Sequence, residues 1–288
     1  MGGLVNFAEF KQVNEARVIT NNAMIALLAG SRLASHTLQL TNGSDQLLPA
    51  IFPRVANIDR FNLVTERAKA LLDDADSHVA AVSVPYALSV HEDFVMVVVN
   101  MLRARGAPAE VPGRRKLGPA TMHETVFKAT GYLAPPDTLE VFHILREMRN
   151  SQIHEGGRAN DRLVRRIASA SAAAAALWSK ITDQDVKDVV RNGRVEFVLE
   201  HMFLVFAIAK ALAREVNSAL QAHWTSHQWA GVLVRDYSAV TTNTRNSSSW
   251  RRSLVGFARL EYGALSLSEA SIETAARGSG HWTAHAWR

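Results

Sequence analysis

The chain of 288 residues contains no cysteine, and this absence excludes two large classes of site. Without thiols there is no disulfide framework, and no thiolate can hold a zinc ion or an iron–sulfur cluster. Glycine is also scarce, with 16 residues and no repeating period, so a collagen-like chain is excluded. Aromatic residues make up only 7% of the chain, but 48% of all residues are hydrophobic. That content is enough for one large or two ordinary domains with a full core.

The sequence also lacks the short motifs of several common enzyme classes. It has no P-loop, no dinucleotide-binding glycine motif, no nucleophile elbow and no H-E-x-x-H zinc motif. We therefore expect no cofactor and no metal at the functional site. The formal net charge is +5, which permits a polyanionic partner without requiring one.

Membrane and secretion signals are missing as well. Residues 1–10 have neither a basic start nor an apolar run. The apolar window 94–102 is too short to span a bilayer, and the window 195–212 contains Glu196, Glu200 and Lys210. We predict that both windows are buried helices, that the protein has no membrane partner, and that it works in the cytoplasm.

The spacing of apolar residues predicts an all-α protein built around an antiparallel helical bundle. A helix starts near Leu63, and Pro85 is expected in the first turn of the next helix, which runs to Arg105. Residues 106–120 contain three glycines and three prolines and are predicted to form a loop. Further helices are expected over 137–154, 162–181, 182–190 and 195–220.

Three regions follow from this pattern. Residues 63–221 form the predicted bundle, and residues 1–62 and 222–288 are extensions of unassigned, mixed structure. The stretch 18–28 fits either a helix or a strand, and the stretch 232–240 fits a strand.

The most informative segment is the end of the predicted helix 137–154. Asp137 and Glu140 have capping-box spacing at its start. Near its end, Asn150 and His154 are four residues apart and share one face. Arg149 and His154 are five apart, about 140° apart around the axis, so only the long arginine stem could bring the two groups together. An imidazole that titrates near neutral pH beside a permanent cation suits chemistry at a phosphodiester.

At Arg149-Asn150-Ser151-Gln152-Ile153-His154 the chain resembles the HEPN superfamily (higher eukaryotes and prokaryotes nucleotide-binding). The signature of that superfamily is Arg, usually a polar residue, a few more positions and then His, late in a helix of an all-α bundle. Arg-Asn-x-x-x-His is its common form. The glycine pair that follows and the neighbouring predicted helices agree with it. The resemblance covers about residues 75–220, roughly half of the chain.

The resemblance implies a metal-independent endoribonuclease of the toxin or antiviral-defence kind. It implies a homodimer in which two motif helices form one composite site, and an antitoxin or regulatory partner. His154 would move a proton, Arg149 would hold the scissile phosphate, and Asn150 would position one of these groups. The products would be a 2′,3′-cyclic phosphate and a 5′-hydroxyl, which requires RNA because DNA lacks the 2′-hydroxyl. Some members of the superfamily only bind nucleotides or RNA, or dimerise, so a non-catalytic scaffold is the alternative.

Basic side chains near the motif are the predicted RNA-binding residues. They are Arg114, Arg115, Lys116, Arg158 and Arg162. Residues 102–166 contain 12 Lys and Arg against 7 Asp and Glu, an excess of +5 that equals the excess of the whole chain. This concentration favours a polyanionic partner.

Other features around the motif leave alternatives open. Glu147 could pair with Arg146 or with Arg149, and His143 is expected to be packed rather than catalytic. The pattern H-W-T-x-H-x-W occurs at residues 223–229 and again at 281–287. Packing is the ordinary role of such tryptophans. Stacking on a base or a partner surface is one alternative, and a metal held by the paired histidines is another.

Overall fold

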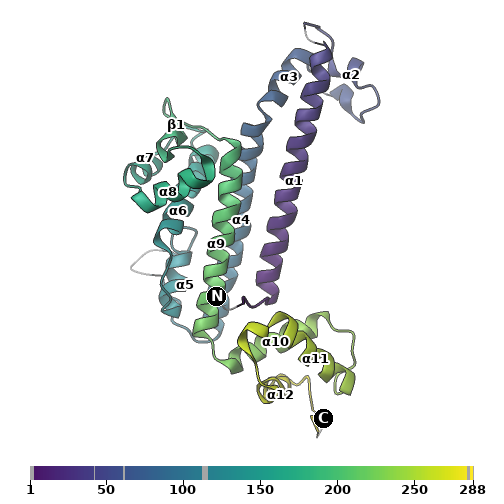
Figure 1. Ribbon diagram of the computed structural model, residues 1–288, viewed down its shortest axis with the longest axis vertical. Coiled ribbons are helices and arrows are strands. Elements are labelled where there is room, and N and C mark those ends of the chain that lie inside the picture. The colour runs from purple at the N-terminus through teal and green to yellow at the C-terminus, as the bar shows by residue number, and fades with distance from the viewer. Residues whose placement is uncertain (1–2, 42, 61, 112–115, 284–285, 288) are drawn as a thin grey trace. The chain divides into compact units, whose positions relative to one another are not determined.

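A computed structural model describes residues 3–41, 43–60, 62–111, 116–283 and 286–287. With 71% of residues in helices and a single two-stranded hairpin in the described part, the protein is all-α, as predicted (Figure 1). The helices are α1 (Ala8–Leu38), α2 (Leu48–Ile51), α3 (Thr65–Asp73), α4 (Ala75–Ala104), α5 (Met122–Thr130), α6 (Pro136–His154), α7 (Asp161–Ala168), α8 (Ala172–Thr182), α9 (Leu199–His223), α10 (Ser226–Val240), α11 (Ser248–Glu261) and α12 (Glu269–Gly278). The hairpin pairs β1 (Val190–Arg191) with β2 (Arg194–Val195).

Contacts within the chain divide it into two units. One unit, here the terminal unit, comprises residues 1–15, 90–135 and 210–288. The other, here the motif unit, comprises residues 16–89 and 136–209. The three regions predicted from the sequence, with boundaries at 62/63 and 221/222, stay predictions.

The core of the terminal unit is aromatic. Phe7 packs against Phe94 and Trp229 with ring centroids 6.4 and 5.7 Å apart, and all three side chains are buried. Helix α10 packs against α12 and α11. Burying such large rings supplies much of the hydrophobic stabilisation of a unit of this size.

The strand predicted at residues 232–240 is wrong, because these residues lie in α10. Thr225 caps α10, and its side chain and that of Gln228 form a complete capping box. That cap fixes the first turn, and the apolar residues after it are buried within a helix rather than a sheet. Val232 and Val234 suggested a strand because β-branched residues are enriched in strands, but they lower helix propensity only slightly.

In the motif unit, α6 packs against α7 and α8. Phe142, Leu145 and Met148 of α6 are fully buried with Leu163 of α7 and Trp178 of α8. The elements predicted between 162 and 190 differ from those observed, because the single helix 162–181 is two helices and 182–190 is a 3-10 helix (Val186–Val189) running into β1.

The break between α7 and α8 has a local cause. The Ser171 hydroxyl accepts from the backbone N–H of Ala174 at 3.1 Å and so caps α8. The Ser171 N–H and hydroxyl both donate to Glu140, at 2.9 and 2.6 Å. The sequence pattern predicted that Glu140 caps the start of its own helix. In the structure Glu140 instead anchors the start of a neighbouring helix, α8.

The two longest helices, α1 and α4, are longer than the sequence predicted. Residues 18–28 lie wholly inside α1, which settles the choice between helix and strand. Pro85 lies inside α4 rather than at a helix start. Among the described residues, α4 is the one helix long and apolar enough to cross a membrane, with a mean hydropathy of 1.4 in its most apolar window. More than half of that window, 56%, is buried inside the protein.

Candidate functional site

The motif lies at the end of α6, where two glycines turn the chain. Gly156 and Gly157 have φ of 58° and 83°, values that favour glycine. The Gly157 N–H donates to the Ser151 carbonyl at 3.0 Å, which closes the end of the helix. The Arg194 guanidinium donates to the Gly156 carbonyl at 2.9 Å, so β2 supports the turn. The helix thus ends at His154, and the imidazole lies in its last turn.

The turn returns the chain so that α7 starts beside the end of α6. The Asn160 N–H donates to the buried Ser151 hydroxyl at 3.2 Å, and the Asn160 side chain caps α7 by accepting from the Leu163 N–H at 2.9 Å. Between the two helices is an open pocket of about 580 Å³. Its lining residues are Glu147, Asn150, His154, Glu155, Asn160, Asp161, Arg162 and Arg165.

A buried ion pair lies at the wall of the pocket. Arg146 and Glu147 are 7% and 1% exposed, and Arg146 Nη2 donates to Glu147 Oε1 at 2.6 Å. The other carboxylate oxygen, Oε2, accepts from Asn150 Nδ2 at 3.1 Å. Of the two partners that the sequence left open for Glu147, the structure shows Arg146. Glu147 holds the Asn150 side chain in one orientation, one turn before His154.

His154 is exposed and makes no hydrogen bond or ion pair with the residues that the structure describes. His143, which lies earlier in α6, differs from His154 in its burial and its pKa. Burial lowers the pKa of His143 to about 3, and the positive charges of Arg166 and Arg146 add to the effect. Arg146 Nε also donates to His143 Nδ1, at 3.5 Å. His143 is thus neutral at physiological pH and packed, which leaves His154 as the motif imidazole that solvent can reach.

The pocket brings together only some of the residues predicted for the site. Asn150, His154 and Arg162 line it, whereas half-buried Arg149 and exposed Arg158 are not among its lining residues.

The other predicted RNA contacts lie elsewhere. Arg114 and Arg115 lie outside the described residues, and Lys116 is exposed and belongs to the terminal unit. Arg165 was not among the predicted RNA-binding residues, but it lines the pocket. Its position three residues after Arg162 on a short helix is the signal that could have found it.

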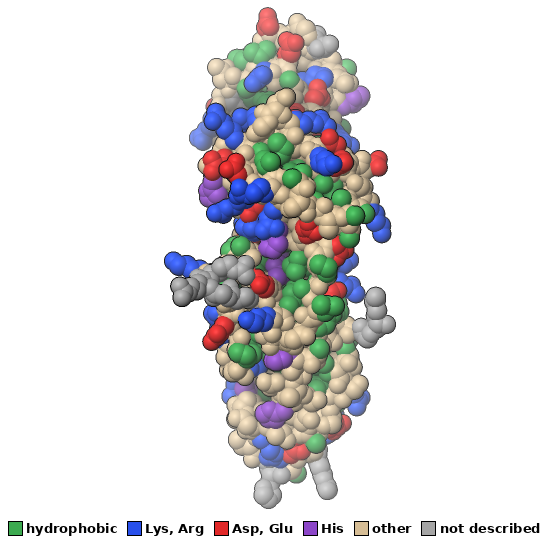
Figure 2. Space-filling view, turned by 90° about the vertical axis from the view of Figure 1, so that its left-hand side faces the viewer, with side chains coloured by type: hydrophobic (Ala, Val, Ile, Leu, Met, Phe, Trp, Pro, Cys, Tyr) green, Lys and Arg blue, Asp and Glu red, His purple; other side chains and the backbone are tan. Residues whose placement is uncertain are grey.

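The charge of the pocket is mixed. Arg162 and Arg165 line it together with Glu155 and Asp161, and Glu147 is paired with Arg146. Figure 2 looks onto the side of the molecule where α7 lies in Figure 1, and it shows basic side chains gathered there with acidic ones between them. The site is therefore polar and exposed, with two cations beside a titratable imidazole.

The two H-W-T-x-H-x-W segments form similar tryptophan pairs within the terminal unit. Trp224 and Trp229 have ring centroids 4.8 Å apart at 64°, and Trp282 and Trp287 have centroids 4.8 Å apart at 74°. Trp224, Trp229 and Trp282 are all at most 5% exposed. The first two pack in the core, which fits the packing role, while His285 of the second copy lies outside the described residues. Within the described residues no group of three His, Asp or Glu side chains could hold a metal ion.

Comparison of the chain with known protein families, with curated proteins and with solved structures finds no match.

Proposed function

We propose that this protein is a metal-independent endoribonuclease of HEPN type with its site at the end of α6. The observation that carries the proposal is the pocket that joins Asn150 and His154 of the motif to Arg162 of the next helix. An exposed imidazole, an amide in a fixed orientation and two arginines are the groups that phosphodiester cleavage by an internal hydroxyl needs.

In this mechanism His154 accepts the proton of the ribose 2′-hydroxyl or donates one to the departing 5′-oxygen. Attack of the 2′-oxygen on phosphorus forms the 2′,3′-cyclic phosphate and releases the 5′-hydroxyl strand. Arg162 and Arg165 offset negative charge on the phosphate oxygens. Arg149 is half-buried outside the pocket of one protomer, so its proposed role in holding the phosphate belongs to a composite site shared by two copies.

The wider setting follows from the resemblance alone. The proposal includes a HEPN-like bundle, a homodimer, RNA as the substrate, a role as a toxin or defence effector in the cytoplasm, and an antitoxin or regulatory partner.

A second function is favoured by one observation. Glu155 and Asp161 line the same pocket as His154, and carboxylates oppose the binding of a phosphate. They are compatible with a non-catalytic HEPN-like scaffold that dimerises, or that binds a nucleotide or RNA at another surface.

Incubating purified protein with RNA in EDTA separates the two functions. The endoribonuclease proposal predicts cleavage that leaves 2′,3′-cyclic phosphate ends and that both Arg149→Ala and His154→Ala reduce. Cleavage unchanged in both variants would contradict the site assignment. No cleavage of any RNA would favour the scaffold.

A further inference from the structure

The contact between Glu147 and Asn150 decides which atom of Asn150 a ligand meets. An ionised carboxylate can only accept hydrogen bonds, so the group of Asn150 that faces Glu147 Oε2 at 3.1 Å must be its NH₂. The other carboxylate oxygen of Glu147, Oε1, already accepts from the permanent cation Arg146 at 2.6 Å, so only Oε2 faces Asn150. The orientation of this amide therefore follows from chemistry rather than from the shape of the side chain alone.

The remaining atom of the amide is an acceptor. The two terminal atoms of a planar amide point apart, so Asn150 Oδ1 points away from Glu147. Asn150 lines the pocket, and none of the described residues donates to Oδ1. A ligand at this point of the pocket meets a carbonyl oxygen, which can accept from a hydroxyl but cannot donate to a phosphate.

We propose that Asn150, oriented by Glu147, recognises the ribose 2′-hydroxyl as a hydrogen-bond donor, and so selects RNA. This inference rests on the proposed function, and it assigns the sugar rather than the phosphate to Asn150. His154 lies one turn further on the same face, so both side chains line one side of the pocket. Glu147 acts through Asn150 and is a positioning residue.

The test compares two ligands that differ only at the 2′ position, where one has a hydroxyl and the other a methoxy group. A fluorescently labelled single-stranded RNA offers both a donor and an acceptor at the 2′ position. The same sequence with 2′-O-methyl groups keeps the acceptor oxygen and loses the donor. Binding is measured by fluorescence anisotropy in a His154→Ala background, so that cleavage does not consume the RNA. The parent protein should bind RNA about five- to tenfold more tightly than the methylated strand, the effect of one hydrogen bond.

Two variants then test the role of the amide orientation. In Glu147→Gln the new amide accepts from Arg146 and turns its NH₂ towards Asn150, which must rotate and present its own NH₂ to the ligand. Because an NH₂ donates equally to a hydroxyl and a methoxy oxygen, the preference for RNA should fall to about one. Asn150→Ala should lose the preference for RNA in the same way. If Glu147→Gln melts at a lower temperature than the parent, Asn150→Ala is the variant that tests the role of the amide.

The matched control is Glu155→Gln, which removes the same charge from the same pocket without touching Asn150. It should keep the preference for RNA. A preference that persists in both Glu147→Gln and Asn150→Ala, or that is missing in the parent while RNA is bound, would overturn this inference and leave the proposed function standing. If the wild type neither binds nor cleaves any RNA, the proposed function fails and this inference fails with it.

Discussion

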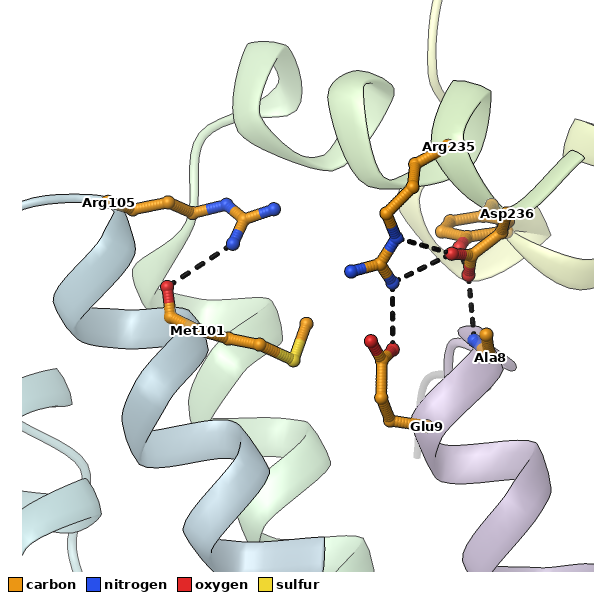
Figure 3. A network of polar contacts seen from close by, with 7 residues as sticks. Ala8, Glu9, Met101, Arg105, Arg235 and Asp236 are labelled. Atoms are coloured by element: carbon orange, nitrogen blue, oxygen red, sulfur yellow. Dashed lines mark hydrogen bonds and ion pairs between the residues drawn. The ribbon is translucent and has the colours of Figure 1, made fainter. Parts of the chain in front are cut away.

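Two clusters of polar residues in this protein differ in how their groups are satisfied. In the terminal unit, Asp236 is 5% exposed and accepts from the Ala8 N–H at 2.7 Å, from the Tyr262 hydroxyl at 2.5 Å and from Arg235 at 2.7 Å (Figure 3). Arg235 also donates to Glu9 at 2.8 Å. In the motif unit, the deep layer of Arg146, Glu147 and Asn150 is similarly paired, but His154 above it is exposed.

The difference separates stability from function. The Asp236 cluster satisfies the first backbone donor of α1 and closes on itself, so its charges serve the fold. Burial and the negative charge of Asp236 raise the pKa of Tyr262, which keeps this hydroxyl a donor. In the motif pocket the inner groups are fixed and the outer ones face solvent, which is the arrangement expected of a binding site.

The largest effect is expected from Asp236→Ala. The change leaves Arg235, Tyr262 and the Ala8 N–H without their shared acceptor, so the free energy of unfolding should fall by about 3–5 kcal/mol. Urea unfolding measures it. A loss below about 1 kcal/mol would show that the cluster is not a structural centre.

The second prediction concerns the loss of stability at acidic pH. His91 and His123 are buried, and their Nε2 atoms are 2.8 Å apart in a hydrogen bond. Burial lowers the pKa of His91 to about 3, below its ordinary value of 6.5. As the pH falls, the His91 imidazole takes up a proton in the unfolded chain before it does so in the folded protein. The stability that depends on neutral His91 is therefore fully present above pH 6.5 and is lost as the pH falls from 6.5 towards 3.

Urea unfolding at several pH values measures this contribution. His91 should add about 1.4 kcal/mol per pH unit to the acid slope of the free energy of unfolding within that window. His91→Phe should reduce the slope, and an unchanged slope would contradict the assignment to this histidine.

The third prediction concerns the turn that joins α6 to α7. Gly157 has φ of 83°, and a Cβ there would lie 3.2 Å from both Arg194 Nη2 and Gln152 Oε1. Gly157→Ala should lower the free energy of unfolding by about 1–2 kcal/mol because of this backbone strain. Gly118→Ala, at an open position without positive φ, is the control and should have little effect.

The smallest effect on the free energy of unfolding is expected at His154, to which the comparison of the two clusters assigns a role in function rather than in stability. His154→Ala removes an exposed side chain and should change the free energy of unfolding by less than about 0.5 kcal/mol. A larger loss would mean that His154 is a structural residue, and the contrast between the two clusters would fail.

The helical class and the position of the motif were predictable because both depend on local spacing. Asn150 and His154 share a face by their separation alone, and the glycine pair ends the helix. The strand predicted at 232–240 failed because the local cap by Thr225 and Gln228 starts a helix there. The role predicted for Glu140 failed because a tertiary contact decides it. Glu140 finds its partner in Ser171, 31 residues away.

The pocket and the Asp236 cluster needed the structure for the same reason. Arg162 and Arg165 reach the motif only through the turn at Gly156-Gly157, and Ala8 lies 228 residues from Asp236. No local pattern encodes such distances.

The most direct test of the central claim is the rate of RNA cleavage by His154→Ala in EDTA, measured on protein shown by urea unfolding to be as stable as the wild type. A general acid or base contributes about 10²–10⁴-fold, so the rate should fall by at least 100-fold. A folded variant that cleaves RNA at the wild-type rate would contradict the placement of the site at the end of α6.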